Sequence, residues 1–172
     1  NDIFSAEISV YQTNIDNLIE CAPIDPSDPY SAWQPKNVAQ AEILGAEATF
    51  SAQIADTSNR LTLSHVDAED KASGKQLARR AHFSANYNFV YVLGELDFTF
   101  DVSYQGASYD NAYDPVKSLK AYTLLDVGVN YRLNDKISLL AKVTNLADED
   151  YQTASEYPGA ERGYSLTFDY KF

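Results

Sequence analysis

The chain has 172 residues, 45% of them hydrophobic, and a formal net charge of −12 at pH 7; its length allows one domain. Because so acidic a chain lacks the basic face that phosphates need, no nucleic-acid partner is expected. No apolar run approaches the roughly 18 to 20 residues of a membrane-spanning helix, which excludes a helical membrane protein. The sequence contains no Met, so we expect a processed or excised piece of a longer protein.

In chain order, the first three segments with alternating apolar and polar residues predict strands at 3–19, 37–54 and 60–69. The alternation is strongest in the next two, 79–90 and 94–107. Between 96 and 104 all even positions are apolar: Leu96, Phe98, Phe100, Val102 and Tyr104. The last three predicted strands are 120–133, 136–146 and 161–172. Eight strands, each with one apolar and one polar face, are therefore expected.

The connections between these strands alternate in length. Short turns are predicted at 55–59, 91–93 and 134–135, and long polar loops at 20–36, 70–78, 108–119 and 147–160. Since successive connections of an antiparallel meander lie at opposite ends of the sheet, the turns gather at one end and the loops at the other. This asymmetry is typical of outer-membrane barrels, which have short periplasmic turns and long extracellular loops.

A soluble β-sandwich also alternates apolar and polar residues, but strands in globular proteins average about 5–6 residues. Several strands here reach the roughly 9–11 residues that a tilted membrane crossing requires. The apolar faces carry no Lys or Arg. Charged residues fall on the other face instead: Glu47, Asp97, Asp101, Asp126, Lys142 and Asp169. The sequence therefore favours an all-β, antiparallel up-and-down meander of membrane strands.

Three segments resemble a known family. Residues 37–48 (NVAQAEILGAEA) resemble its N-x-x-x-A-x-I-x-G-x-E strand, residues 143–151 (VTNLADEDY) its NL-x-D-x-x-Y motif, and residues 163–172 its last strand. The family is that of the TonB-dependent outer-membrane transporters. The resemblance implies that residues 1–172 are a single barrel segment, the last eight strands of a 22-stranded barrel. The N-terminal plug and the earlier strands are absent from it.

Within this family the chain most resembles the transporters of cobalamin (vitamin B12), through residues 77–81, 109–113 and 150–153 and through 161–164. The resemblance implies an active transporter that binds and imports cobalamin, to which this segment contributes channel wall and extracellular loops. It matches Arg79, Tyr113 and Tyr157 to ligand contacts; an exposed loop residue or interface anchor is the alternative for each. A siderophore-iron receptor of the same family stays open, as does a self-contained eight-strand barrel with a structural or adhesive role.

The resemblance also implies partners. They are outer-membrane lipid and lipopolysaccharide, the inner-membrane TonB energy-coupling complex acting through the missing plug, and the barrel-assembly machinery. The last strand resembles the terminal signal that this machinery reads, with an apolar residue at each second position: Tyr164, Leu166, Phe168, Tyr170 and Phe172. A simple anchor in the membrane interface is the alternative for Phe172. No cofactor is expected.

Two further sequence patterns could indicate an enzyme or a metal site, but neither is complete. His82 and Ser84 are expected on the inner face of one strand and resemble the His-x-Ser of an outer-membrane lipid A deacylase. Serine catalysis also needs an orienting acid and an oxyanion site, so no enzyme is expected. Acidic clusters around Asp25, Asp67 and Asp148 lack the spacing of a calcium loop, so no metal site is expected.

Overall fold

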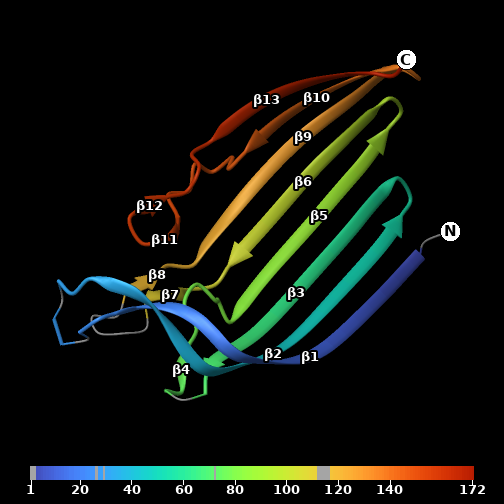
Figure 1. The fold of residues 1–172 in the computed structure, drawn as a ribbon. Helices are drawn as coiled ribbons and strands as arrows, with labels where there is room; N and C mark the ends of the chain where they lie inside the picture. The colour runs from blue at the N-terminus through green and yellow to red at the C-terminus, as the bar shows by residue number, and fades with distance from the viewer. Residues whose placement is uncertain (1–2, 26, 29, 72, 112–116) are drawn as a thin grey trace.

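The computed structural model describes residues 3–25, 27–28, 30–71, 73–111 and 117–172 (Figure 1). Eight long strands form the main sheet: β1 (Ile3–Pro23), β2 (Trp33–Ile54), β3 (Thr57–Asp70), β5 (Phe83–Leu93), β6 (Leu96–Gln105), β9 (Tyr122–Asn134), β10 (Ile137–Thr144) and β13 (Gly163–Tyr170). They follow one another in chain order, each antiparallel to the next. The predicted all-β meander of eight strands is confirmed. The sheet is open, with β1 and β13 at its edges.

The remaining strands are short and lie at one end of the sheet. There β4 (Lys75–Gln76) pairs with the end of β3, β7 (Ser108–Asn111) pairs with β8 (Lys117–Leu119), and β11 (Gln152–Ala154) pairs with β12 (Tyr157–Pro158). We call this the loop end, and the opposite end, where both termini lie, the turn end (Figure 1). No helix within the described ranges is long and apolar enough to cross a membrane.

The turn end has tight turns, as predicted, but one lies further along the chain. The turn expected at 91–93 falls at Gly94 and Glu95, because Leu93 still pairs with Leu96. Gly94 has φ +60°, a conformation that costs a glycine little. At the last turn the Asn134 Oδ1 atom accepts hydrogen bonds from the backbone N–H groups of Lys136 and Ile137, at 2.9 and 3.0 Å.

Two predicted boundaries at the loop end are wrong. The loop expected at 20–36 is shortened to 24–32, because β1 and β2 stay paired as far as Pro23 and Trp33. The strand expected from residue 79 begins at Phe83. The preceding segment is instead held against β3, where the Leu77 N–H donates to the Ala68 carbonyl at 2.8 Å.

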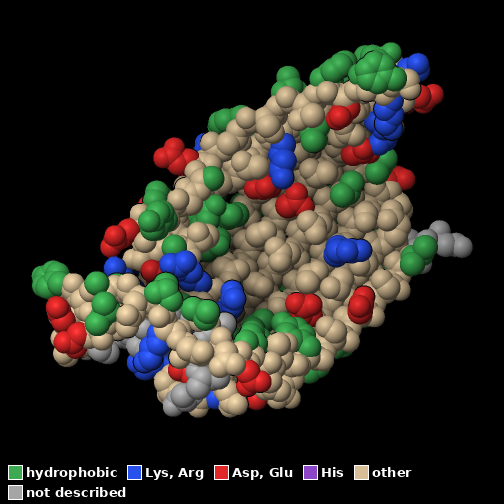
Figure 2. Space-filling view, viewed as in Figure 1, with side chains coloured by type: hydrophobic (Ala, Val, Ile, Leu, Met, Phe, Trp, Pro, Cys, Tyr) green, Lys and Arg blue, Asp and Glu red, His purple; other side chains and the backbone are tan. Residues whose placement is uncertain are grey.

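The strand register separates two faces. Across the turn-end half of the sheet, the outer face carries apolar side chains from every long strand, for example Ile8, Phe50, Phe89, Phe100 and Leu166. The inner face carries the six predicted charged residues, from Glu47 to Asp169, which confirms their placement. Figure 2 shows the hollowed face with acidic and basic side chains on it. Among the described residues, the buried apolar side chains are few and lie at the loop end: Ala41, Ala68, Leu77 and Leu119.

Candidate ligand site at the loop end

The polarity of the two faces reverses along β1 and β2. Near the turn end, the inner face of β1 carries Ser5, Glu7 and Ser9; towards the loop end the same face carries Ile15 and Ile19. Ile15 and the neighbouring Ile43 of β2 pack against the buried Ala41, Ala68 and Leu77. Apolar surface therefore faces inwards at the loop end, where it is available to a ligand.

This surface forms the floor of a cleft of about 610 Å³, the large cleft. Its apolar lining comes from β1, β2 and the segment before β5, and includes Ile15, Ile19, Trp33, Ile43 and Leu77. Its charged lining comes from the connections, with three cations and one carboxylate: Arg79, Arg80, Lys117 and Asp110. An apolar floor with charged groups at its margin is typical of sites that bind amphiphilic small molecules.

Arg79 is fixed at the margin of this cleft by its own backbone and side chain. Its N–H donates to the Tyr109 carbonyl at 2.6 Å, and its Nε donates to the Asp110 Oδ1 atom at 2.7 Å. Its φ of +58° is uncommon for a residue with a side chain. Among the described residues the side-chain partner of Arg79 is bound through Nε, which leaves the two terminal nitrogens available within that part of the chain, and 59% of the side chain is exposed.

A second cleft of about 170 Å³, the small cleft, adjoins the large one at Arg79, which lines both. Its other lining residues come from the ends of β6 and β9 and from the β7, β8 and β11 segments: Gln105, Gly106, Ser108, Leu119, Lys120, Tyr122, Gln152 and Thr153. Gln105 and Tyr122 are direct partners in the sheet. The small cleft therefore lies where three connections meet above two paired strands.

The connection between β10 and β13 is shaped by a buried asparagine. Asn145 is 4% exposed; its Nδ2 donates to the carbonyls of Glu149 and Ala160 at 3.0 and 3.1 Å, and its Oδ1 accepts from the Glu149 N–H at 2.8 Å. Its own N–H donates to the Asp126 Oδ1 atom at 3.0 Å. One residue thus ties both ends of the connection to β9, and gives the NL-x-D-x-x-Y motif a structural role.

Tyr151, the tyrosine of the same motif, lies between two neighbours. Its ring is 4.5 Å from that of Tyr122, measured between centroids. On its other side lies Gly159, where an added Cβ would clash with the ring. The ring therefore fixes the base of the β11–β12 hairpin beside the small cleft.

The sequence-predicted ligand contacts are only partly brought together. Arg79 lines both clefts, although it lies in a connection and not at the start of a strand. Tyr157 is 71% exposed on β12 and is absent from the lining of either cleft. Tyr113 lies outside the described residues.

The predicted assembly segment lies on the free edge strand. Tyr164, Leu166, Phe168 and Tyr170 all lie on the outer face of β13, in register with apolar residues of β10. Phe172 follows the strand, and its ring meets that of Tyr170 edge-on at 5.1 Å.

The placement predicted for His82 is wrong. His82 precedes β5, and its ring stacks on that of His65 with 6.2 Å between centroids. His65 lies on the outer face, in register with Ala46 and Phe83, whereas Ser84 lies on the inner face beside Ser64. His82 and Ser84 therefore do not share a face, so the resemblance to a His-x-Ser catalytic pair loses its geometric basis.

Towards the loop end the outer face of β1 and β2 is polar. Lys71 Nζ contacts the Glu42 Oε1 atom at 2.5 Å, and this hydrogen bond raises the pKa of Lys71 above its usual value. In the connection between β1 and β2, hydrogen bonds from Ser27 lower the pKa of Asp25. The Asp25 carboxylate therefore stabilises its own turn.

Sequence reasoning missed several residues of the clefts, among them Ile15, Ile43, Trp33 and Lys120. Ile15 and Ile43 could have been found, because each breaks the alternation by placing an apolar residue on the polar face. Lys120 and Trp33 had no comparable signal. Their position depends on how the connections fold over the sheet.

Comparisons with known proteins agree with this architecture. Residues 1–146 match the family model described as "TonB dependent receptor-like, beta-barrel". The vitamin B12 transporter BtuB of Photobacterium profundum is 39% identical over 165 residues, which cover 96% of this chain and 27% of that protein. BtuB of Vibrio vulnificus is 32% identical over 171 residues, again 96% of this chain and 27% of that protein. The chain thus spans about a quarter of the length of these curated relatives.

Solved structures share the fold at lower identity. The copper transporter OprC has a TM-score of 0.81 and 18% identity, over 98% of this chain and 29% of that chain. The pyoverdine receptor FpvA from Pseudomonas aeruginosa PAO1 has a TM-score of 0.75 and 21% identity, over 98% of this chain and 27% of that chain. The arrangement of strands is therefore the same in receptors whose names point to different ligands.

Proposed function

We propose that this chain, which belongs to the TonB-dependent receptor family, forms channel wall and part of the ligand site of a receptor that binds and imports cobalamin. The family is located in the outer membrane, and so is this chain. Its members are transporters, and we assign the chain no catalytic role. Residues 1–172 are proposed to form the last eight strands of the barrel. In the complete receptor the plug and the earlier strands would complete the structure.

The observation that carries the proposal is the large cleft at the loop end. Its apolar floor of Ile15, Ile19 and Ile43 suits the hydrocarbon edge of a corrin ring, and Arg79 offers fixed donors to the amide groups around that ring. The curated relatives are named for vitamin B12. The solved structures are only about one fifth identical in sequence, so they support the fold of this chain but not the identity of its ligand.

Import itself is proposed to follow the family's scheme. Ligand captured at the loop end moves through the barrel when the plug responds to the inner-membrane TonB complex. This segment supplies the capture surface and wall, and we propose Arg79, Tyr113 and Tyr157 as ligand contacts within it. Lipid and lipopolysaccharide would surround its outer face, which is apolar over the turn-end half of the sheet.

The test is equilibrium binding of cobalamin to the full-length receptor in detergent. Arg79→Ala, Tyr113→Ala and Tyr157→Ala are each expected to weaken binding by about 1–3 kcal/mol, the usual value of a lost hydrogen-bonded contact. Lys136→Ala, at the turn end, is the control and leaves affinity and folded yield unchanged. A receptor that binds a ferric siderophore and no cobalamin contradicts the proposal in favour of the siderophore alternative.

A further inference from the structure

The small cleft has an electrostatic character opposite to that of the chain. The chain carries a net charge of −12, yet the small cleft is lined by two cations, Arg79 and Lys120, and by no carboxylate among the residues that the structure describes. We propose that the small cleft binds the anionic phosphodiester of the cobalamin nucleotide loop while the corrin ring occupies the large cleft. This inference rests on the proposed function and adds to it a second subsite.

The shape of the small cleft fits one small polar group. Its volume of about 170 Å³ is far below the roughly 300–1,000 Å³ of sites that enclose a whole drug-sized ligand. Besides the two cations, it presents hydroxyl and amide groups from Gln105, Ser108, Tyr122, Gln152 and Thr153. These side chains can donate hydrogen bonds to phosphate oxygens, and bonds to an ionised acceptor are the stronger ones.

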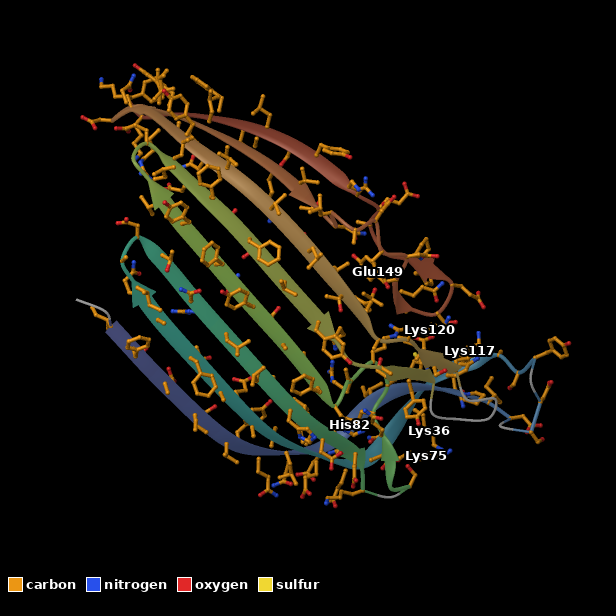
Figure 3. The ribbon with its side chains drawn as sticks, turned by 180° about the vertical axis from the view of Figure 1, so that it is seen from behind. Lys36, Lys75, His82, Lys117, Lys120 and Glu149 are labelled. Atoms are coloured by element: carbon orange, nitrogen blue, oxygen red, sulfur yellow. The ribbon has the colours of Figure 1, made fainter. Side chains whose placement is uncertain are left out.

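The two cations differ in how they are held. Arg79 is engaged through Nε by Asp110, so its terminal nitrogens can face an anion without breaking that ion pair. For Lys120, the structure gives no ion-pair partner within the ranges it describes, whereas nearby Lys117 is paired with Glu156 at 3.2 Å. Figure 3 places Lys117 and Lys120 together at the loop end. Lys120 is therefore the cation most available to a bound anion.

The two clefts adjoin each other, so one ligand can occupy both. Arg79 lines both of them, so a molecule that spans the boundary passes its guanidinium. Cobalamin has a large amphiphilic ring joined to a nucleotide through one phosphodiester, which matches a large cleft with an apolar floor beside a small cationic one. Cobinamide has the same corrin ring but lacks the nucleotide and its phosphodiester, so it serves as the matched probe.

The experiment measures equilibrium affinities of the full-length receptor for cobalamin and for cobinamide. Lys120→Gln removes the charge and keeps a side chain of similar length. It is expected to weaken cobalamin binding about tenfold, the effect of losing one charge-assisted hydrogen bond, and to leave cobinamide binding little changed. Lys36→Gln is the matched control: Lys36 also lies at the loop end (Figure 3) but lines neither cleft, so both affinities should stay as in the wild type.

The outcomes separate this inference from the proposed function. Equal weakening of both ligands by Lys120→Gln, or no weakening of either, overturns the phosphodiester subsite while cobalamin binding by the wild type upholds the receptor function. A wild-type receptor that binds neither corrinoid overturns both. Loss restricted to cobalamin in Lys120→Gln and absent in Lys36→Gln supports the subsite.

Discussion

At the scale of single residues, the clearest lesson concerns Asn145. The sequence identifies the motif of Asn145 but not the role of the residue, because neither the burial of its side chain nor its φ of +48° can be inferred from the motif. The same limit applies to Arg79, whose position between two clefts depends on the segment that Leu77 anchors to β3. Such roles come from contacts between residues distant in sequence, which local patterns do not encode.

Replacing Asn145 with Ala is expected to loosen the whole connection between β10 and β13. The change leaves the Glu149 N–H and two carbonyls without their partner, at a cost of about 1–3 kcal/mol for each group that stays buried. Hydrogen exchange of residues 146–162 in the full-length receptor should speed up. Asn88→Ala, which removes a side-chain bond to Asp101 on the inner face, is the control, and equal exchange in both variants would contradict the role.

At the scale of strands, period-two alternation was a reliable guide. It located all eight long strands within a few residues, because a half-buried strand must place one kind of side chain on each face. It was less reliable at the strand ends. The turn after β5 falls at Gly94 instead of 91–93, and β5 begins later than predicted because Leu77 is bonded to β3. It also missed the reversal of polarity in β1. An apolar Ile15 on the otherwise polar face looks like a break in the alternation unless the strand is known to continue beyond the membrane.

Spin labels on β6 provide a direct test of the two faces. Leu96, Phe98 and Phe100 share the outer face with partners from β5 and β9, while Asp97 and Asp101 lie on the inner face. In receptor reconstituted in lipid, labels at the even positions from 96 to 102 should be accessible to oxygen. Labels at the odd positions should be accessible to water-soluble relaxants. Uniform access along the strand would contradict the membrane orientation.

The pairing of β1 with β2 depends on one glycine. Tyr11 lies directly opposite Gly45, and a Cβ at Gly45 would overlap its ring. Gly45→Ala is therefore expected to displace the ring and lower the temperature at which the barrel unfolds. Tyr11→Ala should cost less when combined with Gly45→Ala than when made alone, as expected for a direct clash. Additive losses in this double-mutant cycle would show that the glycine acts in another way.

At the scale of the whole molecule, the sheet is an open arc with unpaired edges at β1 and β13. Lipid does not tolerate unpaired backbone groups, so these edges need partner strands in the membrane. The family resemblance anticipated this arrangement, because it implied a segment of a larger barrel. Composition and periodicity alone could not distinguish a closed eight-strand barrel from a segment of a larger barrel, because the strands of both alternate apolar and polar residues in the same way.

Deleting Phe172 from the full-length protein is a test of the assembly signal. If the outer-face residues of β13 and Phe172 form a signal for the barrel-assembly machinery, the deletion leaves unassembled chain in the periplasm while purified protein still refolds into lipid vesicles. As a plain interface anchor, Phe172 would contribute at most about 3 kcal/mol of stability, with little effect on insertion in cells. Normal assembly of the deleted protein in cells would contradict the signal.

The strands of this wall are very unequal in length, with 22 residues in β2 and 8 in β13. At about 3.3 Å per residue their contour lengths are about 70 and 26 Å, while the hydrocarbon layer is about 30 Å thick. The rim is therefore lopsided. The β1–β2 hairpin extends well beyond the loop-end limit of β13. In a complete receptor we expect a large ligand to reach the two clefts more easily from the β13 side than across this hairpin.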